Sequence, residues 1–249
     1  MIALCFISGS LAVTLGGAVA SEELRIGGVD LDRRSAHEGA ANYLSGEGGF
    51  GYPAYDAFDA GAGPWRLSDG DLLAPALLNV TVRIPAFYAL IAARVELEAW
   101  LAKVPTDQRL LDAGPDELSL LGELFAVLDD GLTGVRGTTL AKIMHRKRPA
   151  FVPLYDSNIW RSYVGATNAP VRQDRRRKWR EFLPLLAGAM VEDLNREHDW
   201  LGEIAALAAG SVPVTTLRVL DIIAWQAGRT LDIPDDPSDH EPVADSTRL

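Results

Sequence analysis

The sequence predicts an all-α protein. Three observations support this fold class: apolar residues recur at helical spacing in several long segments, strand-like alternation is scarce after residue 70, and no internal repeat has the period of a solenoid or a propeller. The chain has 249 residues, of which 48% are hydrophobic, so it can bury a sizeable core in one domain or two small ones.

Residues 1–24 form an apolar N-terminal segment, and the first 21 residues carry no charged side chain. This length suffices for a membrane span, and the AVA-S at its end resembles a signal-peptidase site. No Lys or Arg precedes the apolar run, however, and Gly and Ser residues interrupt it. A buried strand or helix, or a start codon placed too far upstream, explains the segment as well. We expect a cytoplasmic protein without membrane contact and keep export or anchoring as the alternative.

A helical domain is expected over residues 25–230. Apolar residues at helical spacing follow a proline over residues 85–101 and again over residues 115–128, where two acidic residues occupy the first turn. Further helices are expected within residues 171–208, with Pro184 as a break, and over residues 214–227. Residues 231–249 are acidic, rich in proline and poor in large apolar side chains, which predicts a disordered tail.

A glycine-rich loop over residues 46–64 precedes the first of these helices. Tyr52, Tyr55 and Phe58 lie in this loop and would suit stacking on nucleic-acid bases. Aromatic side chains in such segments more often pin the loop to the core. We therefore expect a packing role for these residues and keep base stacking as the alternative.

The net charge of −10 argues against a protein that coats nucleic acid over its whole surface. The charge is unevenly distributed, because residues 134–180 contain twelve Lys or Arg and only two Asp. Such a concentration can steer a polyanion toward one face of the protein. The alternative is a solvated helix face whose counter-charges lie elsewhere in the fold.

The cysteine and histidine content argues against a metal or redox site. Cys5 is the sole cysteine, which excludes an internal disulfide, a cysteine-ligated iron–sulfur cluster and a cysteine-rich zinc site. His37, His145, His198 and His240 have no metal-ligand spacing. We expect neither a metal ion nor a cofactor.

Residues 132–148 predict a tight glycine-containing turn that joins two helices. Gly134 and Gly137 flank the turn, and the helix N-terminus behind it presents free backbone N–H groups suited to a phosphate oxygen. Basic residues lie on or beside the second helix, where they would neutralise neighbouring phosphates. The expected DNA-binding residues are Gly134, Val135, Arg136, Gly137, Thr138, Lys142, Arg146, Lys147, Arg148 and Arg161.

Asp156 is a lone carboxylate between a basic cluster and Arg161. An Asp before Ser-Asn and a helical run is typical of a helix N-cap, which needs no functional role. The upstream hairpin, its spacing and the basic segment leave a catalytic role open beside the cap, and one side chain can fill both roles. Asn158 is a candidate contact for the substrate, or only a polar residue at a helix start.

The other basic run, RQDRRRKWR, covers residues 172–180. Trp179 and Phe182 keep helical spacing with the leucines that follow, which predicts one buried face with the arginines directed outward. We expect Trp179 to belong to the core beneath a phosphate-facing or merely solvated surface.

The order of glycine hairpin, helix, Pro-apolar-Pro connection and helix-opening aspartate resembles the helix-hairpin-helix DNA glycosylase superfamily. In that superfamily a leucine-x-glycine-valine-glycine hairpin is followed by an Asp-Thr-His-aliphatic-x-Arg segment. The resemblance implies a helical glycosylase-like fold, a hairpin that binds backbone phosphates, and Asp156 as the catalytic carboxylate. The residues that match either motif, or replace it conservatively, are Leu132, Gly134, Val135, Asp156, Ser157, Ile159 and Arg161.

The chain departs from this motif at several positions. Arg136 replaces the second hairpin glycine, and Asn158 replaces the histidine after the aspartate. Thr138 or Thr139 stands where bifunctional members carry a catalytic lysine, so Schiff-base chemistry and strand cleavage are not implied. The chain also resembles an uncharacterised bacterial family that shares the HRKRP and Asp-Ser pattern, and that likeness implies no activity.

The resemblance therefore implies a monofunctional N-glycosylase that excises a flipped, damaged or modified base from duplex DNA. Its carboxylate would stabilise the positive charge that develops on the sugar and orient the attacking water. One rival is a non-catalytic helix-hairpin-helix module that binds DNA. The other is a helical protein whose basic face docks an acidic partner or the negative tail of its own kind.

Overall fold

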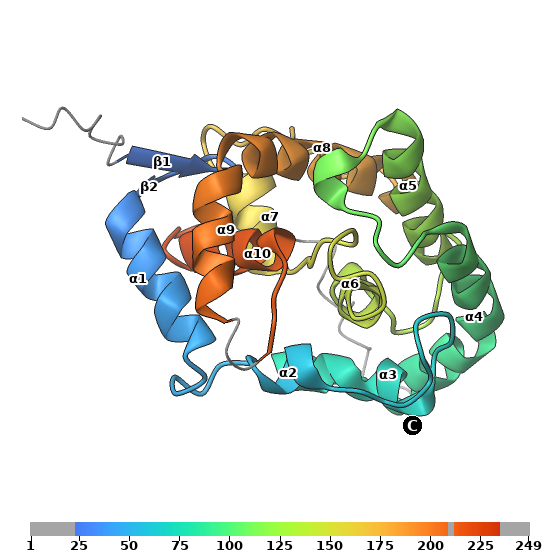
Figure 1. Ribbon diagram of the computed structural model, residues 1–249. Coiled ribbons are helices and arrows are strands. Elements are labelled where there is room, and N and C mark those ends of the chain that lie inside the picture. The colour runs from blue at the N-terminus through green and yellow to red at the C-terminus, as the bar shows by residue number, and fades with distance from the viewer. Residues whose placement is uncertain (1–22, 209–211, 235–249) are drawn as a thin grey trace, which may run out of the picture.

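The computed structural model describes residues 23–208 and 212–234 and is mostly helical (Figure 1). Its elements, in chain order, are β1 (Glu23–Ile26), β2 (Val29–Asp32), α1 (Arg33–Leu44), α2 (Ala54–Ala57), α3 (Asp69–Leu73), the 3-10 helix η1 (Ala74–Leu78), α4 (Ile84–Lys103), the 3-10 helix η2 (Leu110–Asp112), α5 (Pro115–Asp129), α6 (Gly137–His145), α7 (Ser157–Trp160), the π-helical turn η3 (Arg161–Gly165), α8 (Trp179–Arg196), α9 (His198–Leu207) and α10 (Thr216–Arg229).

The mostly helical structure agrees with the expected all-α class, and a short two-stranded antiparallel hairpin precedes the helices. β1 pairs with β2 from Glu23 opposite Asp32 to Ile26 opposite Val29. Leu24 and Ile26 are buried and alternate with exposed residues, as in a half-buried strand. Each strand has only four residues, too few for the alternation to stand out in the sequence.

Two helices form the centre of the fold. All nine residues of α6 are buried, and Figure 1 shows this helix end-on with α3, α4, α5 and α10 around it. α10 packs against α1, α7, α8 and α9, and ten of its fourteen residues are buried. A surrounded helix has little or no solvent face, so polar side chains on α6 and α10 need partners inside the protein.

The two long helices before the glycine turn confirm their predicted positions, because α4 and α5 lie within two residues of the expected bounds. α8 differs from expectation, since Pro184 lies inside it and the chain breaks only at Glu197. Gly122 of α5 lies directly against this part of α8. A Cβ at Gly122 would lie 2.5 Å from the Arg180 carbonyl oxygen and 3.0 Å from the Pro184 ring, so α5 packs closely over the turn that lacks the proline N–H.

The glycine-rich loop is held by its aromatic residues, which confirms the packing role for two of them. Tyr52 and Tyr55 are buried, and the Tyr55 hydroxyl donates a hydrogen bond to the Lys142 carbonyl oxygen at 2.6 Å. Phe58 is half-buried beneath the Arg146 guanidinium, 4.9 Å from the ring centroid. The loop therefore covers α6 rather than presenting its rings to solvent.

The predictions for the two ends of the chain lie largely outside the described residues. These are the apolar segment up to residue 22 and the acidic residues 235–249. Just before the second of these, Ile233 packs against the hydrophobic core. In the part of the chain that the structure describes, no helix combines the length and apolar character needed to cross a bilayer.

Candidate functional site

The glycine turn between α5 and α6 forms as the sequence predicts. Gly134 has a φ of +69°, in the left-handed region that favours glycine. Gly137 begins α6 and packs on Trp179, because a Cβ at this position would lie 2.1 Å from the indole ring. No side chain caps this helix at its N-cap residue, Arg136.

A shallow hollow of about 790 Å³, counting the part open to solvent, lies beside this turn. Three of the expected DNA-binding residues, Gly134, Arg136 and Thr138, line it. Arg83, which the sequence did not single out, is exposed on the same hollow. Val135 points into the core instead and is 7% exposed.

The basic cluster after α6 points into the protein, so the expected phosphate contacts of Lys147 and Arg148 are wrong. Arg148 is fully buried, and its guanidinium donates hydrogen bonds to the carbonyl oxygens of Val104 and Leu101 at 2.7 and 2.6 Å. The Lys147 ammonium lies 2.9 Å from a carboxylate oxygen of the buried Asp71. Both cations are needed to satisfy groups inside the fold.

Arg146 is also turned inward. Its guanidinium donates to the Tyr55 carbonyl oxygen and lies over the rings of Tyr55 and Phe58. The side chain thus joins α6 to the glycine-rich loop. Because Arg146 is only half-buried, its expected contact with a phosphate stays a prediction.

Lys142 and Asp156 meet in a pocket of about 590 Å³, counting the part open to solvent. The Lys142 ammonium lies 3.7 Å from Asp156 Oδ2, and the two side chains are 6% and 22% exposed. Lys142 comes from the middle of α6 and Asp156 directly precedes α7. The structure therefore makes Lys142 a pocket residue rather than the phosphate-facing residue that was expected.

Asp156 caps α7 with one oxygen and faces Lys142 with the other. Oδ1 accepts hydrogen bonds from the amides of Asn158 and Ile159 at 3.0 and 3.1 Å. Oδ2 is the oxygen that lies near the ammonium. The helix-cap reading is confirmed, and it leaves the second oxygen directed at a positively charged group in the pocket.

Three aromatic rings form one wall of this pocket. Tyr43 stacks on Phe50 with ring centroids 4.8 Å apart, and the Trp225 ring meets both edge-on. These residues come from α1, from the loop after it and from α10. Flat apolar walls beside a few polar groups are typical of sites for ring-bearing ligands.

Asp221 of α10 lines the same pocket and was missed by the sequence reasoning. It is 1% exposed, and its Oδ1 has no hydrogen-bond partner among the described residues, while Oδ2 accepts from the Leu154 amide at 3.3 Å. Burial raises the pKa of Asp221 well above the usual carboxyl range, against the opposing effect of the Arg218 charge. A single Asp between apolar residues of the run VLDIIAW was the available signal.

Arg218 completes the polar side of the pocket and is held in place from behind. Its guanidinium donates to Asp56 at 2.8 Å and to the Tyr43 hydroxyl at 3.1 Å. Arg218 and Asp56 side chains are both less than a tenth exposed. Arg218 thereby holds Tyr43, one ring of the aromatic wall, and places a positive charge near Asp221.

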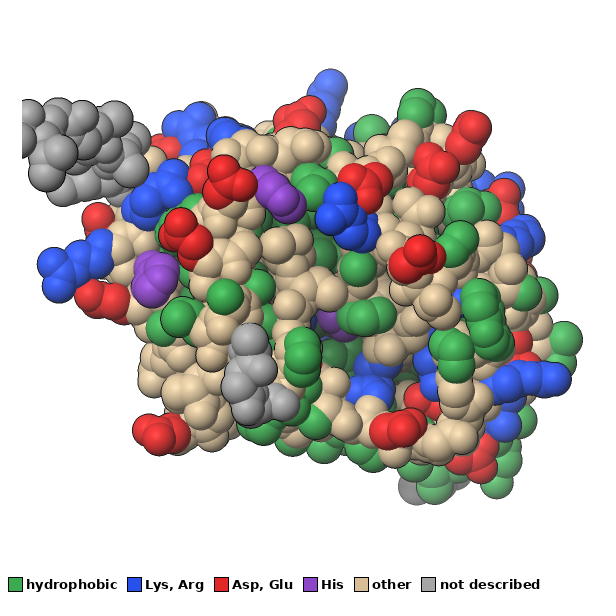
Figure 2. All heavy atoms as spheres, in the orientation of Figure 1, with side chains coloured by type: hydrophobic (Ala, Val, Ile, Leu, Met, Phe, Trp, Pro, Cys, Tyr) green, Lys and Arg blue, Asp and Glu red, His purple; other side chains and the backbone are tan. Residues whose placement is uncertain are grey.

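The remaining predicted residues do not join the pocket. Asn158 accepts a hydrogen bond from Arg161 at 2.8 Å, and neither residue is among those that line it. The basic run of residues 172–180 lies over a separate pocket beside Trp179. On the face drawn in Figure 2, side chains of both charges are intermingled without a continuous basic surface.

The described residues contain no cluster of three His, Cys, Asp or Glu that could hold a metal ion. His145 is buried, and burial lowers its pKa to about 4. Its Nδ1 lies 2.7 Å from the Val152 carbonyl oxygen, so the neutral ring donates a hydrogen bond there. This histidine has a structural position beneath the site.

The chain belongs to DUF6308, a family of unknown function whose model matches residues 36–228. The matched region contains the glycine turn, both pocket aspartates and Lys142. No curated protein and no solved structure matches the chain.

Proposed function

We propose that the protein excises a nucleobase from DNA by hydrolysing its N-glycosidic bond, with the pocket of Lys142, Asp156 and Asp221 as the active site. One observation carries the proposal. The pocket holds the Asp156 carboxylate beside the buried Lys142 ammonium, and it also holds the buried Asp221, one of whose oxygens has no hydrogen-bond partner among the described residues. A wall of aromatic rings faces these groups. The resemblance of the hairpin and the Asp156 segment to helix-hairpin-helix glycosylases supports the same reaction and a glycosylase-like fold.

The pocket suits a base that has left the duplex. It combines an aromatic wall with a few buried polar groups, as small-molecule sites commonly do. The rings of Phe50 and Trp225 provide apolar contact to a planar heterocycle, and the buried polar groups provide hydrogen bonds to its edge. An enzyme that acts on a base inside duplex DNA needs a pocket of this kind, because the reacting atoms are otherwise shielded by stacking.

Asp156 is the group that would act at the sugar. Cleavage passes through a state with positive charge at the anomeric carbon, which a nearby carboxylate stabilises. Lys142 and the amides of Asn158 and Ile159 hold this carboxylate in one orientation. Oδ2 then orients the attacking water and accepts its proton as the new C–O bond forms.

Asp221 would act at the leaving base. Burial raises the pKa of Asp221 and so favours its protonated form, which can donate its proton to a ring nitrogen or oxygen. As the C–N bond breaks, the bonding electron pair stays with the base, which takes the Asp221 proton. The step leaves Asp156 protonated and Asp221 ionised, and exchange with water restores both.

The glycine turn would bind the phosphates of the DNA strand whose base is flipped. Its hollow shares Asn79 with the active-site pocket, so the two adjoin. Arg83 and Arg136 line this hollow beside the uncapped N-terminus of α6. A phosphate there would accept hydrogen bonds from backbone N–H groups and be neutralised by the two arginines.

The second candidate is a helix-hairpin-helix module that binds DNA without catalysis. The capping bonds of Asp156 favour it, because they give the residue a structural reason to be present. The unpaired oxygen of Asp221 favours the enzyme. A buried oxygen without a hydrogen bond destabilises the fold, and such groups are common where a side chain acts on a ligand.

The test uses duplex oligonucleotides that each carry one damaged or modified base. Abasic sites are detected by alkaline strand cleavage after incubation with the protein, with Asp156→Asn or with Asp221→Asn. Asp116→Asn is the matched control, because it makes the same chemical change at an exposed position of α5. We expect release of at least one base by the native protein and the control, and a loss of about 100-fold or more in both pocket variants.

The binding module is supported instead if every protein binds the duplexes and none releases a base. The proposed function fails altogether if Arg83→Ala and Arg136→Ala leave both affinity and its salt dependence unchanged.

A further inference from the structure

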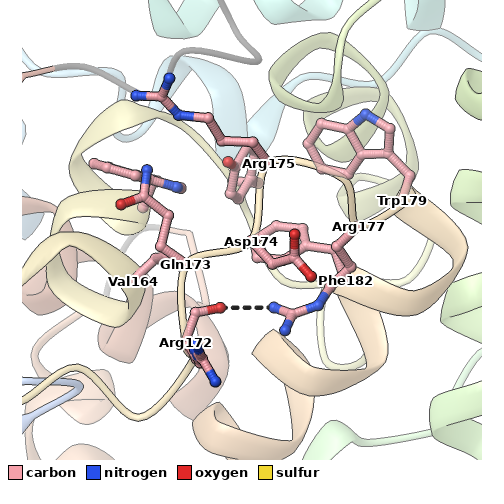
Figure 3. A pocket seen from close by; sticks show the side chains of 10 residues that line it. Val164, Arg172, Gln173, Asp174, Arg175, Arg177, Trp179 and Phe182 are labelled. Atoms are coloured by element: carbon pink, nitrogen blue, oxygen red, sulfur yellow. Dashed lines mark hydrogen bonds between the residues drawn. The ribbon is translucent and has the colours of Figure 1, made fainter.

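A second pocket lies beneath the loop that joins η3 to α8, and the proposed reaction does not use it. Its volume is about 790 Å³, counting the part open to solvent. Figure 3 shows the loop residues Arg172, Gln173, Asp174, Arg175 and Arg177 around this pocket, together with Trp179 and Phe182.

Aromatic side chains form the floor of this pocket. The Tyr155 ring meets the Trp179 ring edge-on at 5.2 Å, and the Phe182 ring meets both at 5.5–5.6 Å. Trp179 and Phe182 are only partly buried, whereas Tyr155 and Trp160 are buried. The packed rings therefore present a rigid aromatic surface to a ligand and do not need to move to receive it.

Arginine side chains form the rim. Residues 172–180 carry six Lys or Arg and one Asp. The Asp174 carboxylate accepts a hydrogen bond from the Arg176 amide at 2.9 Å. Figure 3 shows the second bond, in which Arg177 donates to the Arg172 carbonyl oxygen at 2.8 Å. These two bonds hold the loop in shape, while the Arg172 and Arg175 side chains are exposed.

We propose that this pocket binds an unpaired nucleotide of a DNA strand, with its base against Trp179 and Phe182 and its phosphates at Arg172 and Arg175. Aromatic floors with arginine rims are how proteins hold single-stranded nucleic acid without reading its sequence. The acidic residues 235–249 have a complementary charge, but they contain no Phe, Tyr or Trp to use the aromatic floor.

The position of the pocket connects it to the active site. Tyr155 and Trp160 line this pocket, while Asp156 and Ile159 line the active-site pocket, so one short segment forms a wall of both. A strand whose target base enters the active site can place another unpaired nucleotide across that wall. This role rests on the proposed function, because it takes the same DNA as the ligand.

The test measures binding of fluorescently labelled oligothymidine to the full chain by anisotropy at low salt. A strand of the same length and phosphate number, but with abasic sugars, is the comparison ligand. We expect the abasic strand to bind about ten-fold more weakly, because stacking is lost while the charge is kept. Arg175→Ala should weaken oligothymidine binding about five-fold. Arg176→Ala should change it by less than about two-fold, since Arg176 is exposed but does not line the pocket.

Equal affinity for the two strands, or equal effects of the two arginine substitutions, would show that the loop acts only as diffuse charge and would overturn the proposal. Binding of a synthetic peptide of residues 235–249, lost in Arg175→Ala, with no binding of oligothymidine, would assign the pocket to the acidic segment instead. Asp156→Asn separates this proposal from the proposed function, because it should abolish base release and leave the preference for oligothymidine over the abasic strand intact.

Discussion

Replacing Asp156 by Asn or by Ala separates the two roles of this side chain. Asn keeps an oxygen that accepts the Asn158 and Ile159 amides but removes the charge that faces Lys142, whereas Ala removes both. At 3.7 Å the two charges attract each other by about 4 kcal/mol if the effective dielectric constant is near 20. In Asp156→Asn the ammonium of Lys142 stays buried, so its desolvation cost remains, and only the smaller desolvation cost of the partly exposed Asp156 carboxylate is regained; we expect a net loss of about 3 kcal/mol.

Asp156→Asn should therefore lower the free energy of unfolding by about 3 kcal/mol, and Asp156→Ala by about 1 kcal/mol more, because the α7 cap is lost. Lys142→Met should cost less in the Asp156→Asn background than in the native protein, because the unpaired ammonium is removed. Urea unfolding at pH 7 measures the four proteins of this double-mutant cycle and the Asp156→Ala variant. Additive effects of the two substitutions would refute the pairing of Lys142 with Asp156. An Asp156→Ala variant as stable as Asp156→Asn would refute the cap.

Three further predictions follow from buried side chains. Burial raises the pKa of Asp221, so between the ordinary carboxyl pKa and this raised value the folded chain holds a proton that the unfolded chain releases. The free energy of unfolding therefore falls as pH rises through this range, by at most about 1.4 kcal/mol per pH unit. Asp221→Asn should remove this slope when urea unfolding is measured at several pH values. Burial lowers the pKa of His145 from 6.5 to about 4, so the free energy of unfolding should fall by up to about 3 kcal/mol as pH falls from 6.5 to about 4. His145→Asn should remove this part of the pH dependence in the same urea measurements. Arg148→Met should cost about 3–5 kcal/mol by leaving buried carbonyl groups without donors, and a thermal shift of less than a few degrees would contradict its burial.

The sequence predicted the helices best where a long apolar segment begins at a proline. α4 and α5 have long apolar patterns and a proline at their first turn, and both were located within two residues. The turn at Gly134 was found because a left-handed backbone needs glycine. The break at Pro184 was predicted wrongly, because the packing of α5 against that turn depends on Gly122, more than sixty residues away in the chain.

The direction of the basic side chains was the main error. Helical periodicity treats a Lys or Arg as a marker of the solvent face, and α6 has no solvent face. Lys147 and Arg148 follow this helix and turn inward to a carboxylate and to carbonyl groups that lie forty or more residues earlier in the chain. Long-range pairing of this kind leaves no local pattern.

The candidate site was predicted in part. Asp156 was identified from its neighbours, and its capping role was anticipated. Asp221 was not, although a lone acidic residue in an apolar run is a signal for a buried carboxyl group. The aromatic wall joins Tyr43, Phe50 and Trp225 from distant segments, and only the folded chain brings them to the same pocket.

The most direct test of the proposed chemistry does not require the target base to be known. A duplex is prepared with an abasic-site analogue that carries a cationic nitrogen in place of the anomeric carbon, and its dissociation constant is compared with that of a duplex carrying an uncharged abasic site. If Asp156 stabilises a positive sugar, the native protein should bind the cationic duplex about 100-fold more tightly, and Asp156→Asn should lose that preference. Equal affinity of the native protein for both duplexes, or an unchanged preference in Asp156→Asn, would contradict the assignment of Asp156 as the catalytic carboxylate.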